Sequence, residues 1–348
     1  MPDTIKDQIT AHSEAVLVIV FLAVADQAAV DLLSAWATFS KEHTHGFVLA
    51  VSLATAKAPP LPDGVRDEMM MCLGLDDLDE RDLRCDFVSL HALNCSLQLL
   101  ARLSAENEGN DSASPRTGNP TLFFSHAKRD GVPLSTSIVS WIQRLHGFQF
   151  FYDTRNLDLK GDISAQLEQA VSNSVLVVLR TEVFDQRYWC QKEVFWAEKH
   201  GVPVISVDAR WNLQHAPSVM AFDSSPSVRI PDGSLVRILI AALSEALRVA
   251  CFRARVRLTA QGAGLAKNSW TTLPRFPSLA SLHSAAEKER KTVVEQQQTR
   301  PCFFMVHANP AMPDGIREVP NDVAAALIPG SRVLSLDEFR VHCYALKP

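Results

Sequence analysis

Apolar runs alternate with segments of helical periodicity along most of the chain. In the amino-terminal segment, residues 1–103, the runs AVLVIVFLAV (15–24) and GFVLAVSL (46–53) predict two strands. The stretch between them, AAVDLLSAWATFSKEH (28–43), has the spacing of an amphipathic helix, as does HALNCSLQLLARL (91–103). This part of the chain therefore begins as a β-α-β arrangement.

Residues 104–118 interrupt the pattern. The segment SAENEGNDSASPRTG has no apolar periodicity and is rich in Ser, Asn, Gly and Pro, which is typical of a linker. We predict a domain boundary there, with a separate domain covering 119–252.

Strands and helices alternate regularly within 119–252. Strands are predicted at 121–127, 148–153, 174–180, 203–208 and 228–230, and helices at 133–147, 163–173, from Asp185 as the cap to 199, and 233–252. Gly201 is the expected stop of the third helix. Strands without internal polar alternation, separated by helices, indicate a parallel sheet that is covered on both faces.

The carboxy-terminal segment, 253–348, is basic and broken by Pro and Gly at its start. Residues 284–298 are either a polar helix or a linker. The stretches 302–308, 319–328 and 331–339 predict one strand-helix-strand unit. We expect the amino-terminal and carboxy-terminal segments to pair into a second α/β unit around the middle domain.

Composition and charge exclude several classes of protein. The chain has 348 residues, a net charge of −5 and 47% hydrophobic residues, so neither nucleic acid nor an anionic membrane is an expected partner. The apolar run 15–25 is shorter than the ~20 residues of a bilayer span. The seven cysteines include no CxxC pair, which argues against a zinc site or a disulfide framework and favours a reducing, cytoplasmic location.

Three stretches of the middle segment resemble one known family. They are LFFSHAKRDG (122–131), FQFFYDTRNLDLKGDISAQLEQAVSNSVLVVL (148–179) and DQRYWCQKE (185–193), and they occur in the order and spacing of a TIR (Toll/interleukin-1 receptor) domain. The third stretch is similar to the family's W-C-x-x-E box. The resemblance implies a flavodoxin-like α/β domain with a parallel five-stranded sheet and further α/β segments at both termini.

Glu193, the glutamate of that box, has two interpretations. Residues four apart share a helix face, so Trp189 and Glu193 are neighbours and Trp196 lies close to both. Cys190, Val194 and Ala197 form a separate apolar stripe that can pack on the sheet, where a thiol is inert. Periodicity alone favours a solvated charge beside core tryptophans. The resemblance instead implies a carboxylate that is required to cleave NAD⁺.

The chemistry of that cleavage needs no metal and no cofactor besides NAD⁺ as the substrate. Nicotinamide leaves as a neutral group, and the ribose that remains is oxocarbenium-like. One carboxylate in a dry pocket can stabilise this cation. The attacking group is either water, which yields ADP-ribose, or the adenine of the same molecule, which yields a cyclic isomer.

Other residues have weaker assignments. Phe124, Ser125 and His126 end the first strand of the middle segment, where the family's ligand cleft opens. As alternatives to a cleft role, Phe124 is a core residue, Ser125 caps the strand end and His126 is a surface residue. Asp130 either holds the loop after that strand or, as the residue type favours, is a turn or cap residue.

The predicted loop after the second strand supplies three further candidates. Asp153 closes that strand and is either a ligand or a turn residue. Arg155 and Lys160 could meet a pyrophosphate, although exposed loop cations are usually solvated.

The resemblance leaves a second function open. Many TIR domains are non-catalytic assembly modules, whereas catalytic members become active when they self-associate, in some cases as filaments. The enzymatic reading implies a cytoplasmic effector of prokaryotic antiviral defence, with a separate sensor protein or a signal ligand as the trigger. The flanking segments would then sense, inhibit or bind a partner.

Overall fold

The computed structural model describes part of the chain. The described residues are 16–22, 31, 34–35, 38, 46–52, 71–74, 86, 89–90, 92–98, 100–101, 120–143, 149–151, 162–210, 225–229, 235–266, 268–296, 302–308 and 312–345. The chain divides into two compact units: Met1–Asn119 with Ser234–Leu247, and Pro120–Gly233 with Arg248–Pro348. None of the helices in these ranges is long and apolar enough to cross a membrane.

The first unit contains a three-stranded parallel sheet in the order β1-β2-β3. Its strands are β1 (Val16–Leu22), β2 (Gly46–Ser52) and β3 (Met71–Gly74). The first two confirm the predicted strands, and β3 was not predicted. The residues described between 86 and 101 are helical, and Leu90 and Cys95 are buried among them. The predicted linker 104–118 lies outside the described residues.

The main sheet of the second unit is parallel throughout, in the order β5-β4-β6-β7-β8. Its strands are β4 (Thr121–His126), β5 (Gln149–Phe151), β6 (Ser174–Arg180), β7 (Val204–Asp208) and β8 (Ser227–Arg229). Every strand predicted in the middle segment is therefore present. Numbered along the chain, this order is 2-1-3-4-5, in which the direction of winding reverses between the first and third strands.

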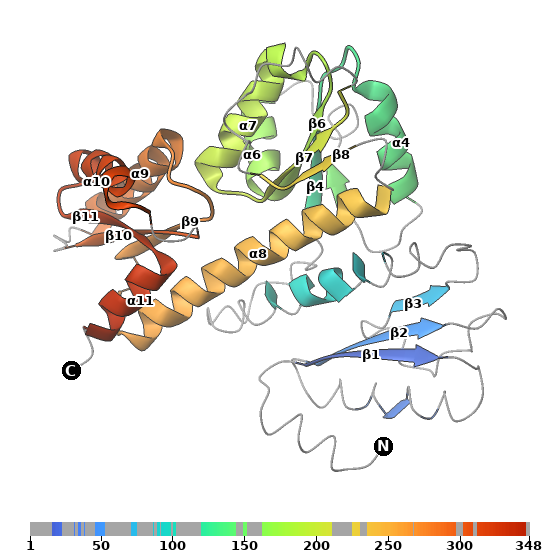
Figure 1. Ribbon diagram of the computed structural model, residues 1–348, viewed down its shortest axis with the longest axis horizontal. Helices are drawn as coiled ribbons and strands as arrows, with labels where there is room; N and C mark the ends of the chain where they lie inside the picture. The colour runs from blue at the N-terminus through green and yellow to red at the C-terminus, as the bar shows by residue number, and fades with distance from the viewer. Residues whose placement is uncertain are drawn as a thin grey trace. The chain divides into compact units, whose positions relative to one another are not determined.

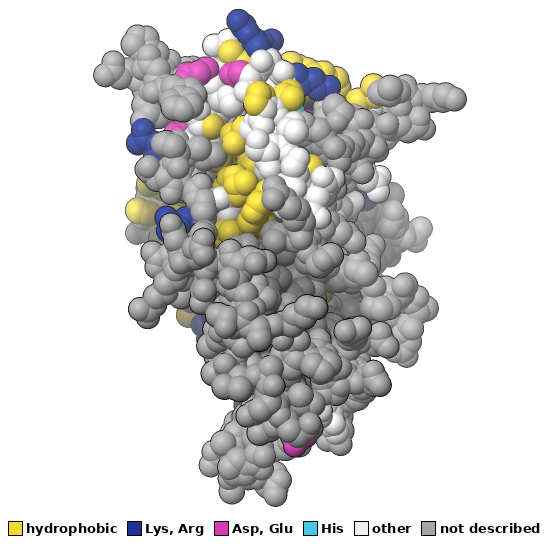
Figure 2. Space-filling view, turned by 90° about the vertical axis from the view of Figure 1, so that its right-hand side faces the viewer, with side chains coloured by type: hydrophobic (Ala, Val, Ile, Leu, Met, Phe, Trp, Pro, Cys, Tyr) yellow, Lys and Arg dark blue, Asp and Glu magenta, His cyan; other side chains and the backbone are white. Residues whose placement is uncertain are grey.

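Helices cover both faces of this sheet (Figure 1). On one side lie α6 (Ile163–Ser172) and α7 (Tyr188–His200), and on the other lies α4 (Val132–Ile142). The core under α6 and α7 joins Phe123, Leu176 and Val178 of the sheet to Leu167 and Val194 of the helices. On the face that Figure 2 shows, hydrophobic side chains gather in the middle of the described surface, and Lys and Arg side chains lie at its upper edge.

The start of α7 differs from the prediction, whereas its end agrees. Asp185 does not cap the helix: it lies in the 3₁₀ turn Phe184–Gln186 and pairs with Arg180 at 2.8 Å, and both side chains are buried. The helix begins three residues later at Tyr188. It ends at Gly201, which adopts the left-handed conformation (φ 60°) that glycine permits without strain.

The carboxy-terminal part of this unit contains a second parallel sheet, in the order β11-β10-β9. Its elements follow the helix α8 (Leu235–Gly262), and they are β9 (Trp270–Leu273), α9 (Leu279–Gln296), β10 (Phe303–His307), α10 (Asp314–Leu327), β11 (Ser331–Ser335) and α11 (Leu336–Ala345). We call the part from Ser269 to Ala345 the C-terminal module.

Strand alternation divides the core of the C-terminal module in two. Phe304 and Val306 share a cluster with residues of α8 and α11, whereas Phe303 and Met305 share one with residues of α9 and α10. Successive side chains of a strand point to opposite faces, so β10 can be buried on both sides by helices.

Three predictions for the flanks need correction. Strand β9 was missed, because WTTL is short and follows a basic segment rich in Gly. Residues 331–339 were interpreted as one strand, but they contain β11 and the start of α11. The two terminal segments do not share a sheet in the described part of the chain, because β1–β3 and β9–β11 form separate sheets in different units.

Replacement of Gly201 tests how the end of α7 is held. A Cβ at Gly201 would lie 3.0 Å from Cδ of Pro274 and would also be strained by the positive φ, whereas Gly264 (φ 69°) has open space around it. We expect Gly264→Ala to lower the free energy of unfolding by about 1–2 kcal/mol, from backbone strain alone. Gly201→Ala should lower it by more. Urea denaturation measures both. Equal losses would show that the Pro274 contact adds no cost.

Candidate functional site

The site begins at the carboxyl end of β4. Phe123 belongs to the core under α6 and α7, so Ser125, two residues on, points to the same face. The Ser125 hydroxyl donates a hydrogen bond to Oε2 of Glu193 in the middle of α7. Ser125 is 1% exposed and Glu193 8% exposed. The carboxylate predicted from the W-C-x-x-E spacing is therefore buried and hydrogen-bonded, which contradicts the interpretation as a solvated surface charge.

Glu193 lines a cavity of about 780 Å³. The lining residues come from the end of β4 and the loop after it, from α6, and from the start of α7: His126, Ala127, Lys128, Arg129, Ile163, Leu167, Arg187, Tyr188, Trp189, Cys190 and Glu193. The volume falls within the range of small-molecule and cofactor sites. The cavity lies at the carboxyl ends of the strands, near the reversal of winding between β4 and β6, where open α/β sheets bind ligands.

The two tryptophans of α7 have different environments. Trp189 lines the cavity and is 44% exposed, whereas Trp196 is buried in the core and is not among the cavity's lining residues. Of the two tryptophans that helical spacing places near Glu193, Trp189 lines the cavity and Trp196 does not. The helical stripe of Cys190, Val194 and Ala197 packs in the core as predicted.

Lys192 organises the aromatic surface beside the cavity. Its ammonium lies 5.0 Å from the ring centroids of Trp189 and Trp196 and 5.5 Å from that of Tyr188, and it donates to the Ser164 hydroxyl at 2.8 Å. The rings of Tyr188 and Trp189 also meet edge to face at 5.5 Å. These contacts order the first turn of α7, because the cation is attracted to all three ring faces.

Three exposed cations line the same cavity as the carboxylate. Lys128 and Arg129 come from the loop after β4, and Arg187 immediately precedes α7. Glu193 is the one acidic residue that lines the cavity in the described part of the chain. These cations were not among the residues predicted from the sequence, although Lys128 and Arg129 lie two and three residues after His126 in LFFSHAKRDG. Their position predicts a positive potential at the mouth and a negative charge inside.

Two polar contacts hold the loops that form the site. Asp130 accepts a hydrogen bond from the Thr181 hydroxyl at 2.7 Å and another from the Val183 amide at 3.2 Å, which ties the loop after β4 to the end of β6. Asp130 lies in a turn, but its carboxylate binds a distant segment, so it holds the loop after β4 and its interpretation as a mere turn or cap residue is wrong. Gly131 closes the same loop: its amide donates to the Ala127 carbonyl, and a Cβ there would lie 2.9 Å from that oxygen.

The remaining candidates are only partly brought together. His126 lines the cavity, and its Nδ1 lies 3.2 Å from the Phe124 carbonyl oxygen. Phe124 itself is buried and does not line the cavity. Asp153, Arg155 and Lys160 lie outside the described residues.

The Cys190 thiol has no nucleophilic character in this setting. Burial, and secondly the charge of Glu193, raise its pKa to about 12. A thiol that stays protonated attacks electrophiles poorly, so Cys190 serves packing. The candidate chemistry at this site therefore belongs to the carboxylate.

Comparison with known proteins identifies no relative: no family model matches the chain, and no curated protein matches its sequence.

The reactivity of Cys190 checks this assignment. At pH 8 we expect iodoacetamide to leave Cys190 unmodified in the folded protein, because its thiolate fraction falls roughly a thousandfold when the pKa rises from its ordinary 9.0 to about 12. The half-buried Cys251 should be labelled faster, as peptide mapping by mass spectrometry will show. Because the pKa is raised only in the folded state, this thiol's contribution to stability is complete below pH 9 and is lost as the pH rises towards 12. Rapid labelling of Cys190 in the folded state would refute the assignment.

Proposed function

We propose that residues 119–252 form a TIR-type domain that cleaves the bond between nicotinamide and ribose in NAD⁺. The observation that carries the proposal is the Glu193 carboxylate, which is buried, bonded to Ser125 and placed in a cavity of about 780 Å³. The 2-1-3-4-5 strand order supports it too, since it is the order of flavodoxin-like folds, to which the resemblance assigns TIR domains.

Glu193 acts on the positive charge that develops at ribose. When the C1′–N1 bond breaks, its electron pair goes to the nicotinamide ring, which leaves as a neutral molecule. The carboxylate stabilises the oxocarbenium-like ribose, and its burial strengthens this interaction because little water screens it. Water then bonds to C1′ and loses a proton, giving ADP-ribose. Attack by the adenine of the same molecule, with loss of its proton, gives a cyclic isomer.

Ser125 positions the carboxylate. A glutamate side chain has three rotatable bonds, and fixing it before substrate arrives reduces the cost of ordering it in the transition state. The Ser125 hydroxyl does this from β4, the strand that pairs with both β5 and β6 in the main sheet. Trp189 supplies an aromatic face beside the carboxylate on which a nicotinamide or adenine ring can stack.

The cations at the cavity mouth match a dinucleotide. Its pyrophosphate carries two negative charges, and Lys128, Arg129 and Arg187 are the described cations that line the cavity. An arginine can hold two phosphate oxygens at once, which favours Arg129 and Arg187 as the principal contacts. Arg155 and Lys160 remain candidates for the same role.

The proposal includes activation by self-association and a role in antiviral defence, with NAD⁺ depleted or converted into a signal when an infection is sensed. Non-catalytic assembly is the alternative. It needs only a surface, such as the loop after β5 and neighbouring helices, that binds another TIR domain without turnover, and it gives no reason for a buried carboxylate that lines an open cavity.

The direct test replaces the carboxylate without changing its shape. We expect Glu193→Gln to reduce nicotinamide release from NAD⁺ at least ~100-fold, because removal of one electrostatic contact to the transition state costs that much or more. Chromatography of the products at high protein concentration measures the release and separates ADP-ribose from a cyclic isomer. Glu198→Gln, on the same helix but outside the cavity, is the matched control and should keep its activity.

Two results would count against an enzyme. Equal release by Glu193→Gln and wild type would remove the carboxylate from the chemistry. No release by the wild type at any concentration, together with concentration-dependent association in light scattering, would favour the assembly module.

The cationic mouth makes a separate prediction about substrate binding. Arg187→Ala should raise the KM for NAD⁺ about fivefold with kcat little changed, since an exposed ion pair contributes about 1 kcal/mol to ground state and transition state alike. The effect should shrink as salt is added. Arg340→Ala, an exposed arginine of α11, is the control. A change in kcat alone would place Arg187 in the chemistry instead.

A further inference from the structure

The turn that joins α7 to β7 is held from outside the main sheet. Arg253 of α8 donates from Nη2 to the Gly201 carbonyl at 2.8 Å. Arg275, in the turn after β9, donates from Nη2 to the Val204 carbonyl at 2.8 Å and from Nη1 to the Ser225 hydroxyl. Val202, between the two bonded carbonyls, is buried. Two arginines that belong to neither α7 nor the main sheet thus bind the first residue after α7 and the first residue of β7.

The turn after β9 is itself fixed against the same place. Pro274 packs on Gly201 so closely that a Cβ there would lie 3.0 Å from its ring. The Pro274 carbonyl accepts a hydrogen bond from Arg248 of α8 at 3.0 Å. The turn is therefore bound on one side to α8 and on the other to the end of α7. Because Pro274 and Arg275 follow β9 directly, the C-terminal module is anchored at this point.

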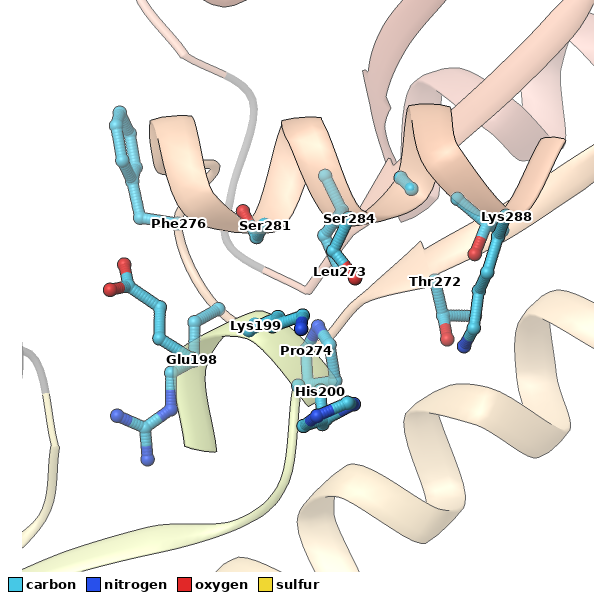
Figure 3. Close-up of a pocket in the computed structure, with 14 residues that line it drawn as sticks. Glu198, Lys199, His200, Thr272, Leu273, Pro274, Phe276, Ser281, Ser284 and Lys288 are labelled. Atoms are coloured by element: carbon cyan, nitrogen blue, oxygen red, sulfur yellow. The ribbon is translucent and has the colours of Figure 1, made fainter. Parts of the chain in front are cut away.

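The last turn of α7 packs beside α9, with a small cavity between them. Figure 3 shows the end of α7, with Lys199 and His200, beside α9, which carries Ser281, Ser284 and Lys288. The cavity between them is only about 40 Å³, so the two helices have little room to move relative to each other.

The same turn of α7 is held on its other side by α6. Glu168 accepts hydrogen bonds from Lys199 at 2.8 Å and from His200 at 2.9 Å. The end of α7 is therefore fixed between α6 and the C-terminal module.

We propose that Arg253 and Arg275 are positioning residues for Glu193, acting through α7. An α-helix rises 1.5 Å per residue, so Gly201 lies only about 12 Å along the axis from Glu193, and a helix this short moves as a rigid rod. A shift at Gly201 therefore changes the distance between Glu193 and Ser125, which sits on a different element. The C-terminal module, which has no counterpart in the TIR resemblance, becomes part of the site's framework. The effect of the two arginines on α7 is independent of the proposed function, whereas their effect on catalysis rests on it.

The experiment compares single substitutions in the full chain. Arg253→Ala and Arg275→Ala each remove one arginine-to-carbonyl bond at the α7–β7 turn, and Arg275→Ala also removes the bond to the Ser225 hydroxyl. Arg290→Ala removes a bond of the same kind, to the Leu327 carbonyl at 2.9 Å, inside the C-terminal module and away from α7. Arg275→Lys keeps the charge and one donor direction but loses the fork, so it tests the geometry in a variant that is expected to fold.

Hydrogen exchange of the α7 amides is the first measurement. Exchange across residues 188–200 should rise about five- to tenfold in Arg253→Ala and Arg275→Ala, as expected for the loss of one hydrogen bond that holds the helix end. It should rise less in Arg275→Lys and remain unchanged in Arg290→Ala. Nicotinamide release is the second measurement: kcat should fall by a similar factor with the KM for NAD⁺ unchanged, because a displaced carboxylate weakens transition-state stabilisation more than substrate binding.

The outcomes separate the two proposals. Exchange in α7 that matches the Arg290→Ala control would overturn the positioning role, whatever the activity. A uniform rise across α6, α10 and β4 as well would also overturn it, because it would show general destabilisation. A rise confined to α7, in a protein whose wild type releases no nicotinamide, would uphold the positioning role and refute the proposed function.

Discussion

The hydrogen bond from Ser125 to Glu193 is the interaction on which the site depends. A carboxylate buried without a donor carries a desolvation cost of several kcal/mol, which it would avoid by taking up a proton or by turning to solvent. The hydroxyl at the end of β4 removes part of that cost and fixes the carboxylate in one direction. The hydrogen bond forms only if β4 presents Ser125 on the face that α7 covers and if α7 places Glu193 opposite it. The bond therefore links the register of the strand to the rotation of the helix.

The surrounding structure fixes both partners of this bond. On the strand side, Asp130 ties the loop after β4 to the end of β6, so the edge of the sheet at which the cavity opens is rigid. On the helix side, Lys192 orders the start of α7, and the contacts of Gly201 with Arg253 and Pro274 fix its end. A helix held at both ends keeps its central residue in place. Polar contacts at the end of β4 and at both ends of α7 thus hold the Glu193 carboxylate in a position that apolar packing alone would not fix.

Most of the secondary structure was predictable because burial on both faces leaves an unambiguous pattern. Strands such as β6 and β10 are apolar at nearly every position, and helices of ordinary length separate them. The failures share a cause. Strand β9 is four residues long and half-buried for most of its length, and it is a strand because β10 offers it a hydrogen-bonding edge. Asp185 has the chemistry of a cap, but the buried guanidinium of Arg180 offers it a stronger partner.

The candidate site was predictable in kind and not in arrangement. The spacing W-C-x-x-E is enough to place Glu193 on one helix face with Trp189, and Cys190 and Val194 on the packed stripe, because helical periodicity is a local property. Packing between distant elements makes Trp196 a core residue and turns Phe124 away from the cavity. It also brings Lys128 and Arg187 to the cavity lining and Ser125 to Glu193. Those facts depend on which strand face a distant helix covers, and 68 residues separate the two partners of the central hydrogen bond. A local sequence pattern cannot predict a contact between residues so far apart in the chain. The contact depends on which face of the assembled sheet the helix α7 covers.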